Sequence, residues 1–411
     1  MKLTEIKIKN YRSIEEASFV LSDKNKSQTY TLIGINESGK TSFLKGISLI
    51  DGGEVVYPRD YFDPRNPIEI ILTYDVSDKV NKSLIEDLDK RGVNKEVTSK
   101  IHVDRVEVGI RYEPVAGAAG ISFEEYYFPK DTLPGYHLNA TTPEKKPEGS
   151  EAEDLSFSKV LKIHAPSFFY DNCHYITFWK SDPKHLIGDQ INLESFAANP
   201  TNVSIPLANC FLLAKADAKT EIASIKNDTA LRQNLLDRLS DSVTEHIKKV
   251  WPNHPVKIKF NINNMMLEFL IEDDEVKYKT KTTGQRSDGF KQFISFLLTI
   301  SAEHANSSLE RSLLLLDEPE THLHPKAQEF LRDELIKITS NKLNNIVFFA
   351  THSSYMIDRD CIERCVRVEK RGNAKTKLVE IQPGISSYAE INYEVFDVTS
   401  SDYHNELYGV V

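Results

Sequence analysis

Short apolar runs that end abruptly in polar residues are the most regular pattern in this chain. Three of them, residues 30–33, 312–316 and 346–350, show no alternation of polar and apolar side chains. A strand in the middle of a parallel sheet is buried on both faces and has this pattern. Stretches with apolar residues at helical spacing lie between and beside these runs, at 41–50, 205–214, 218–251 and 293–300. Together they predict an α/β fold with a central sheet.

The region after the first helix has a different pattern. Residues 67–75, 101–112 and 121–128 alternate enough to predict strands, and residues 78–90 predict a charged helix between the first two. These strands predict an antiparallel β lobe beside a mixed central sheet. Residues 129–154 are rich in Pro, Gly, Thr, Lys and Glu. We expect a mobile loop there, because such a composition buries little apolar area.

The first apolar run is followed by GINESGKT at residues 34–41, which matches the spacing G-x-x-x-x-G-K-[ST]. The backbone N–H groups of such a loop close around a phosphate, its Lys reaches the outer phosphates and its hydroxyl binds Mg²⁺. A helix that begins directly after the loop points its positive dipole end at the same anion. We therefore expect ATP here, surrounded by Asn36, Glu37, Ser38, Gly39, Lys40, Thr41 and Ser42.

The other two apolar runs also end in candidate functional residues. Asp317 and Glu318 follow one run, and His352 follows the other. In open α/β folds, nucleotides bind at the edge of the sheet where the carboxyl ends of the strands lie. We expect Asp317 to hold Mg²⁺ together with Thr41, and Glu318 to polarise the water that attacks the γ-phosphate. Lys40, Glu318 and His352 are thus the candidate catalytic residues.

The order and wording of these motifs resemble the ABC-type ATPases of the RecF, SMC and overcoming-lysogenization-defect (OLD) group. IKIKNYRSI at residues 6–14 resembles the first strand and turn of that group. DEPETHLHP at residues 317–325 resembles the corresponding motif of its OLD-like branch. The resemblance implies a P-loop NTPase with the fold of an ABC-ATPase head. It also implies that Arg12 is brought to the nucleotide.

The resemblance further implies a signature loop that completes the nucleotide site of a second subunit. GQRSDGFKQ at residues 284–292 lies at the expected place, before an apolar helix. By resemblance, Ser287 and Gly289 would contact the γ-phosphate of the opposite protomer, with Arg286 beside them. Asp288 stands where the commoner LSGG wording has Gly, and Ser287 is also a natural helix N-cap. The alternative that these residues only begin a helix, with no role in a second subunit, therefore stays open. The lid glutamine that many relatives carry is not located in this sequence.

The pattern and the resemblance together predict four parts of the chain. Residues 1–180 would form an N-terminal ATPase lobe, 181–272 a short helical insertion, 273–385 a C-terminal ATPase lobe and 386–411 a tail. In SMC proteins the insertion is a long coiled coil, for which this one is too short. We expect a compact helical subdomain that signals to a partner or contacts a second protomer.

Composition and charge limit the classes of protein to which the chain can belong. The net charge is −10, from 51 basic and 61 acidic residues, which argues against a surface covered in phosphate contacts. No apolar run reaches the ~20 residues needed to span a bilayer, and no signal peptide is visible. The four cysteines contain no C-x-x-C pair. We expect reduced thiols in a cytoplasmic protein without a membrane partner.

These observations predict an ATPase that uses ATP and Mg²⁺ and acts as a homo-oligomeric switch, a dimer or higher. The sequence shows no convincing effector, so we expect a separate effector protein, a Toprim-type nuclease or a toxin, as in PARIS-like anti-phage systems of prokaryotes. That step is an analogy at the level of the family. Two alternatives stay open: a RecF-like ATPase of DNA repair or recombination, with DNA as a ligand, and a scaffold that scarcely hydrolyses ATP.

Overall fold

The computed structural model describes residues 1–22, 27–51, 55–114, 121–127, 132–250, 256–273, 280–285, 288–307, 310–340, 344–371, 375–380 and 393. The chain divides into two compact units, each assembled from separated segments. Unit 1 comprises residues 1–28, 32–177 and 365–383, and unit 2 comprises residues 29–31, 178–364 and 384–411. Strands β3 (Thr29–Ile33) and β11 (Tyr175–Lys180) therefore contribute residues to both units.

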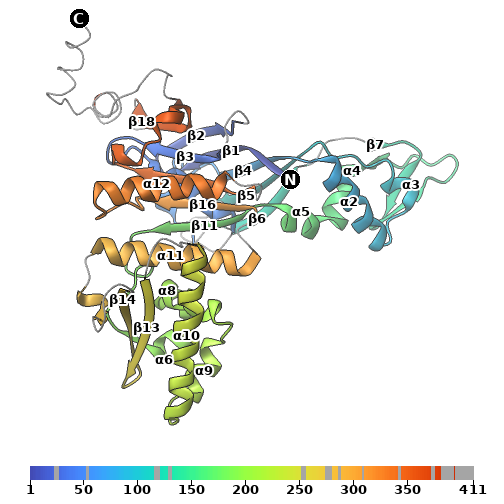
Figure 1. Cartoon of the computed structure of the whole chain (residues 1–411). Helices are drawn as coiled ribbons and strands as arrows, with labels where there is room; N and C mark the ends of the chain where they lie inside the picture. The colour runs from blue at the N-terminus through green and yellow to red at the C-terminus, as the bar shows by residue number, and fades with distance from the viewer. Residues whose placement is uncertain are drawn as a thin grey trace, which may run out of the picture. The chain divides into compact units, whose positions relative to one another are not determined.

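Unit 1 is built around a five-stranded antiparallel sheet with the strand order β2-β1-β4-β5-β6 (Figure 1). Its strands are β1 (Lys2–Tyr11), β2 (Ile14–Val20), β4 (Ile68–Asp75), β5 (Arg105–Glu113) and β6 (Ile121–Tyr127). Apolar side chains on one face of β1 and β4 are buried, as the alternating pattern of the sequence predicted. The prediction of an antiparallel lobe is confirmed.

Helices and a second hairpin complete unit 1. Helix α1 (Lys40–Ser48) follows β3 and buries Phe43, Leu44 and Ile47. Gly46 faces β1 so closely that an added Cβ would lie 2.8 Å from Cδ1 of Ile8. The other elements are η1 (Leu49–Asp51), η2 (Pro58–Asp60), α2 (Asp78–Lys90), α3 (Lys95–Thr98), β10 (Leu155–Ser156), α4 (Phe157–His164), α5 (Pro166–Asn172), β18 (Cys365–Arg371) and β19 (Lys375–Glu380).

The prediction of a loop over residues 129–154 is wrong for part of this stretch. The structure has β7 (Thr132–Leu133) and a hairpin of β8 (Tyr136–Asn139) and β9 (Thr142–Lys145) here. Two ion pairs connect the end of this hairpin to neighbouring segments: Lys145 Nζ lies 2.9 Å from Glu96, and Lys146 Nζ lies 2.7 Å from Asp154. The β8–β9 hairpin is thus held by cross-strand hydrogen bonds and ion pairs, which the composition of this stretch could not predict.

Unit 2 contains the parallel part of the central sheet. Strands β16 (Ser312–Asp317) and β17 (Ile346–Thr351) run parallel, and the hydrogen-bonded order is β11-β16-β17-β3. The apolar residues of β16 and β17 are fully buried, as the unbroken apolar runs predicted. In unit 1 the order continues as β3-β18-β19, with β18 and β19 antiparallel. The predictions of an α/β fold and of a mixed central sheet are confirmed.

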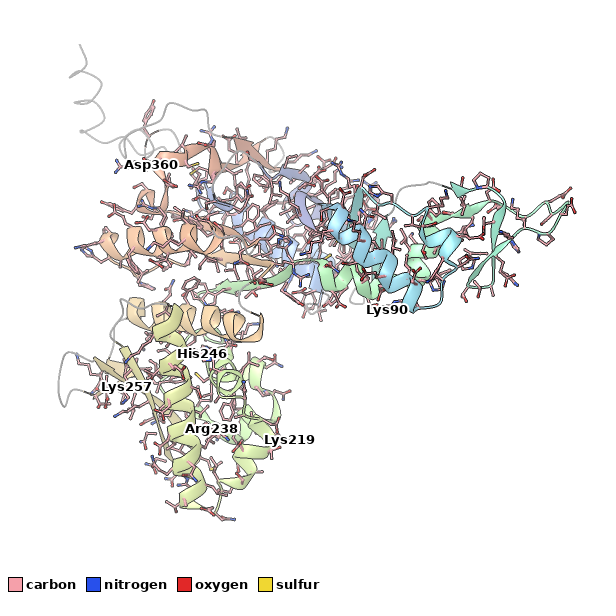
Figure 2. All side chains as sticks on the ribbon, turned by 45° about the vertical axis from the view of Figure 1, so that its right-hand side comes forward. Lys90, Lys219, Arg238, His246, Lys257 and Asp360 are labelled. Atoms are coloured by element: carbon pink, nitrogen blue, oxygen red, sulfur yellow. The ribbon has the colours of Figure 1, made fainter. Side chains whose placement is uncertain are left out.

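The helical insertion also belongs to unit 2. It contains β12 (Ile191–Asn192), α6 (Leu193–Ala198), α7 (Pro200–Val203), α8 (Ile205–Leu213), α9 (Ala218–Ser224), α10 (Thr229–Val250), β13 (Val256–Asn263) and β14 (Met266–Asp273). The apolar stripe of α10 is buried at Leu235, Leu239 and Val243. Its polar side carries Arg238, which is labelled in Figure 2. Arg238 forms an ion pair with Glu221 of α9. The predicted helical insertion is present.

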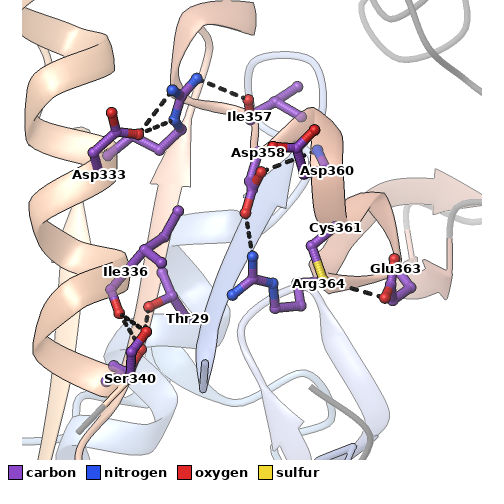
Figure 3. Close-up of polar contacts among 12 residues, drawn as sticks. Thr29, Asp333, Ile336, Ser340, Ile357, Asp358, Asp360, Cys361, Glu363 and Arg364 are labelled. Carbon is purple, nitrogen blue, oxygen red and sulfur yellow. Dashed lines mark hydrogen bonds and ion pairs between the residues drawn. The ribbon is translucent and has the colours of Figure 1, made fainter. Parts of the chain in front are cut away.

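The remaining elements of unit 2 are β15 (Thr280–Thr282), η3 (Thr283–Gln285), α11 (Asp288–Ser307), α12 (Pro325–Thr339), η4 (Ser354–Met356) and η5 (Arg359–Arg364). Arg332 of α12 donates to the Ile357 carbonyl, directly after η4, over 3.2 Å (Figure 3). Thr29 Oγ1 of β3 donates to the Leu335 carbonyl of α12 over 3.0 Å. The buried Arg364 guanidinium pairs with Asp358. The predicted tail, 386–411, lies outside the described residues apart from Tyr393.

Candidate functional site

The loop that follows β3 in unit 1 requires glycine at two positions. Gly34 has φ 154° and Gly39 has φ 112°, and both face the β18–β19 hairpin. An added Cβ would lie 2.4 Å from the Val368 carbonyl oxygen at Gly34 and 2.3 Å from Thr376 Oγ1 at Gly39. At these two positions, therefore, the backbone conformation and the close neighbours leave room for glycine alone. This is the phosphate-binding loop (residues 34–41) of the sequence.

Two side chains of the phosphate-binding loop are buried and turned inward. Lys40 Nζ donates to the carbonyl oxygens of Gly34 at 2.8 Å and Ile35 at 3.1 Å. The Ser38 hydroxyl is buried and has no hydrogen-bond partner among the described residues. A buried hydroxyl is rarely left unpaired, so an unpaired one in this loop suits a ligand oxygen. By contrast, Asn36, Glu37 and Thr41 are exposed to solvent and Ser42 is half-buried.

Thr376 of β19 joins the phosphate-binding loop to the turn after β1. Its Oγ1 lies 2.9 Å from the Ser38 carbonyl oxygen and 2.8 Å from Ser13 Oγ. A carbonyl can only accept, so the threonine hydroxyl donates to Ser38 and accepts from Ser13. Sequence reasoning missed this contact, because nothing in the local pattern marks Thr376.

Arg12 lies in the same turn and already has a partner. Its Nε donates to Asp60 Oδ1 over 2.9 Å, and its backbone N–H donates to the Asp60 carbonyl over 2.7 Å. Its φ of 51° places it in the left-handed region, which is uncommon for a residue with a side chain. The backbone strain and the ion pair together fix the position of Arg12. Its contact with a nucleotide stays a prediction.

In unit 2 the candidate acids lie where β16 ends. Asp317 is the last residue of β16 and is paired in register with Ala350 of β17. Because the two strands are parallel, the polar residues after each lie at the same edge of the sheet. Glu318 follows with φ 51°, again in the left-handed region. Its N–H donates to the Ala350 carbonyl over 3.1 Å, and its own carbonyl accepts from Thr321 Oγ1 over 2.9 Å.

The parallel strands bring Glu318 and His352 together. Glu318 Oε1 lies 3.1 Å from His352 Nε2. The two side chains are 42% and 33% exposed, so the pair is open to a ligand although both residues follow buried strands. A carboxylate beside an imidazole, both accessible, is suited to accept and stabilise a proton from a bound water. The sequence predicted both residues as candidates but not the contact between them.

Glu320 is a polar residue of this region that sequence reasoning did not select. It is 4% exposed, and its Oε1 accepts hydrogen bonds from Thr351 Oγ1 and, over 3.2 Å, from the His352 N–H. Its Oε2 is buried without a partner among the described residues. Burial raises the pKa of Glu320 to about 7, against the lowering effect of these hydrogen bonds. The third acid of the DEPE motif (residues 317–320) was the available signal.

The buried Glu320 makes the stability of the protein depend on pH. Because its folded pKa of about 7 lies above the ordinary value of 4.5, its contribution is fully present below pH 4.5 and is lost as the pH rises through 7. We expect Glu320→Gln to match the parent at pH 4 and to exceed its unfolding free energy by on the order of 3 kcal/mol at pH 8. Urea unfolding of both proteins at the two pH values measures this, and parallel pH dependences would contradict it.

The start of α11 lies directly against the acidic loop (residues 318–324). A Cβ added to Gly289 would lie 2.2 Å from the His322 carbonyl oxygen, so only glycine permits this approach. His322 has φ 65°. Arg286 and Ser287 of the predicted signature loop lie outside the described residues. The observed contact of Gly289 is within the chain, and its contact with a neighbour's nucleotide stays a prediction.

The candidate ligands for Mg²⁺ are oxygen donors. Thr41 offers an exposed hydroxyl and Asp317 a half-buried carboxylate. Mg²⁺ prefers such hard oxygen ligands, and in nucleotide sites it takes one or two of them and completes its shell with phosphates and waters. Within the described residues, no group of three or more His, Cys, Asp or Glu side chains gathers as a metal site. The donor types present therefore fit a metal that arrives with a nucleotide.

Comparisons with known proteins bear on the chain as a whole. The family model described as "AAA ATPase domain" matches residues 1–187, and the one described as "AAA domain, putative AbiEii toxin, Type IV TA system" matches residues 221–358. The Old nuclease of Escherichia phage P2 is 20% identical over 430 residues, which cover 98% of this chain. The chain belongs to the ABC/AAA ATPases of the OLD, SMC and RecF group. The predicted family is thereby confirmed.

Other relatives of this OLD-group ATPase match less of it. Protein ea59 of Escherichia phage lambda is 28% identical over 200 residues, or 42% of the chain. The chain spans 66% of the length of the Old nuclease and 35% of that of ea59. A solved SMC head bound to the C-winged helix domain of ScpA has a TM-score of 0.45 and 15% identity over 93% of this chain and 99% of that one. In the described part of the OLD-group ATPase, no helix is long and apolar enough to cross a membrane.

Proposed function

We propose that this OLD-group ATPase binds ATP with Mg²⁺ and hydrolyses it, and that the cycle works as a switch between oligomeric states. The observation that carries the proposal is the accessible pair of Glu318 and His352, 3.1 Å apart at the end of β16 and β17. A left-handed backbone fixed by hydrogen bonds holds Glu318 in this place. Such strain in a residue with a side chain is typical of functional sites.

Each residue has a separate role in the proposed reaction. Lys40 neutralises charge on the outer phosphates, and the N–H groups and side chains of Asn36, Glu37, Ser38, Gly39 and Ser42 line the phosphates. Thr41 and Asp317 would hold Mg²⁺, which when bound polarises the phosphates. Glu318 orients the attacking water and accepts its proton, and His352 stabilises the charge that develops on the γ-phosphate. Arg12 would approach the nucleotide from the turn after β1.

The switch would depend on a second copy of the chain. In the proposal, Arg286, Ser287 and Gly289 contact the γ-phosphate held by the neighbouring protomer. ATP then joins two protomers, and its hydrolysis releases them, as in other phosphate-sensing switches. The membership of the chain in the OLD, SMC and RecF group supports this step.

The output of the switch would pass to a separate effector, a nuclease or a toxin, in defence against phage. The description of the matching family, which names a putative toxin and a type IV toxin–antitoxin system, supports a role in a system of that kind. Cells that carry the gene with its neighbours should resist phage infection, and a Lys40→Ala variant should give no protection. Counting plaques on both strains tests this. Equal protection would exclude a role for ATP binding in defence.

Phosphate release by the purified chain tests the enzymatic part of the proposal. We expect turnover with Mg²⁺ and ATP, loss of turnover with EDTA, and a larger particle mass in ATP than in ADP. The same assay with single-stranded and duplex DNA separates the RecF-like alternative. Strong stimulation by DNA would favour that alternative, whereas equal rates with and without DNA favour the switch proposed here.

A further inference from the structure

Gln292 is a fully buried amide on α11 that has no role in the reaction described so far. It is 1% exposed, and its neighbours on the helix, Ile294, Phe296 and Leu297, belong to the apolar core of unit 2. A buried amide must find partners for its two N–H donors and its oxygen, or it destabilises the fold. The partners of Gln292 therefore show what it holds.

The Gln292 amide connects three segments of unit 2. Its Nε2 donates to the carbonyl oxygens of Glu318 and Pro319, each over 3.1 Å. Its Oε1 accepts from Ser181 Oγ over 3.4 Å. Backbone carbonyls can only accept, so chemistry fixes the orientation of the amide: its nitrogen faces the acidic loop and its oxygen faces Ser181. Ser181 directly follows β11.

One of the two carbonyls that Gln292 holds belongs to Glu318, the proposed catalytic acid. Glu318 lies in the left-handed region at φ 51°, a conformation that persists only when surrounding contacts enforce it. Thr321, from the same loop, makes local contacts with this carbonyl. Gln292 contacts the same carbonyl from another element, 26 residues earlier in the chain. It therefore helps to hold the acidic loop against α11.

We propose that Gln292 is a positioning residue for Glu318. By holding the carbonyls of Glu318 and Pro319, it keeps the Glu318 carboxylate beside His352, where it acts on the attacking water. This rests on the proposed ATPase function. Gly289 supports the assignment, because one turn earlier on α11 it packs against the His322 carbonyl of the same loop. Two close contacts thus fix α11 to the acidic loop.

The test replaces the amide by an apolar side chain of similar length. We expect Gln292→Met to lower kcat for ATP about 10- to 100-fold and to leave KM for ATP unchanged, because a misplaced catalytic group slows chemistry without weakening binding. Thr299→Val is the matched control. It lies on the same helix, and among the described residues its hydroxyl bonds within α11, to the Ser295 carbonyl, so its kcat should equal that of the parent.

A second variant separates positioning from general instability. In Gln292→Glu, an ionised carboxylate would face two carbonyl oxygens, whereas the protonated form can donate one hydrogen bond. The ratio of its kcat to that of the parent should therefore rise about tenfold between pH 8 and pH 6. A side chain that only fills space would give a ratio independent of pH. This readout holds even if Gln292→Met fails to fold.

The outcomes distinguish the two proposals. If the parent shows no turnover of ATP, the proposed function fails and the role of Gln292 fails with it. If the parent hydrolyses ATP and Gln292→Met keeps its kcat, or if the Gln292→Glu ratio does not change with pH, the positioning role is overturned while the ATPase stands. A lower kcat at unchanged KM together with the pH-dependent ratio supports the assignment.

Discussion

Replacing Glu318 by glutamine should stop the turnover of ATP and leave ATP bound. The amide keeps the size of the side chain but cannot accept the proton of the attacking water, and general-base catalysis contributes about 10²- to 10⁴-fold to a rate. We therefore expect kcat to fall by at least about 100-fold, with the affinity for ATP within about twofold of the parent. Single-turnover phosphate release and equilibrium binding of ATP measure the two quantities.

A matched control for this variant is Glu144→Gln, which removes the charge of an exposed acid on β9. It should turn over ATP at the parental rate. The trapped Glu318→Gln protein should also remain in the larger, ATP-bound particle, because hydrolysis no longer releases the protomers. If Glu318→Gln and the parent release phosphate at the same rate, Glu318 is not the base and the scaffold alternative gains support.

Removal of the Lys40 side chain should abolish the binding of ATP itself. The ammonium lies inside the phosphate-binding loop, where it donates to the carbonyls of Gly34 and Ile35. It is positioned to make a charge-assisted hydrogen bond with a phosphate, and truncating one partner of such a buried pair costs about 2–5 kcal/mol or more. We expect Lys40→Ala to weaken the affinity for ATP by about 100-fold or more, as measured by calorimetry at physiological salt.

Lys45 provides the control, since it lies one turn later on α1 and carries the same charge. Lys45→Ala should bind ATP within about threefold of the parent, which would show that the net charge of α1 does not explain the loss. Because Lys40 also bonds loop carbonyls, the unfolding midpoint of both variants should be compared. An unchanged affinity in a folded Lys40→Ala protein would refute a nucleotide site at this loop.

The sequence predicted those parts of the molecule whose signals are local. Strands β16 and β17 are unbroken apolar runs, and the phosphate-binding loop has fixed spacing, so both were located by residue number. The candidate residues Lys40, Asp317, Glu318 and His352 were found because each directly follows such a run or lies in such a loop. Their joint action on one nucleotide stays a prediction that the variants above test.

Contacts between distant residues could not be predicted in the same way. Thr376 and Ser38 are 338 residues apart, and Glu320 and Thr351 are 31 apart. Neither pair leaves a periodic or compositional trace in the sequence. Gln292 and Glu320 could at best be suspected, because each places a polar side chain within or beside an apolar stretch. The hairpin at residues 136–145 was missed for a related reason, since cross-strand hydrogen bonds and ion pairs join its residues and no apolar periodicity marks it.

The long separation between Ser38 and Thr376 affects how a newly made chain acquires its nucleotide site. A ribosome adds roughly 5–20 residues per second, so the 338 residues between the two take about 20–70 seconds to synthesise. During that time the nascent phosphate-binding loop lacks the hairpin against which its two glycines pack. We therefore expect a stalled or prematurely terminated chain that ends before β18 to be unable to capture ATP, which would keep incomplete copies from joining finished ones.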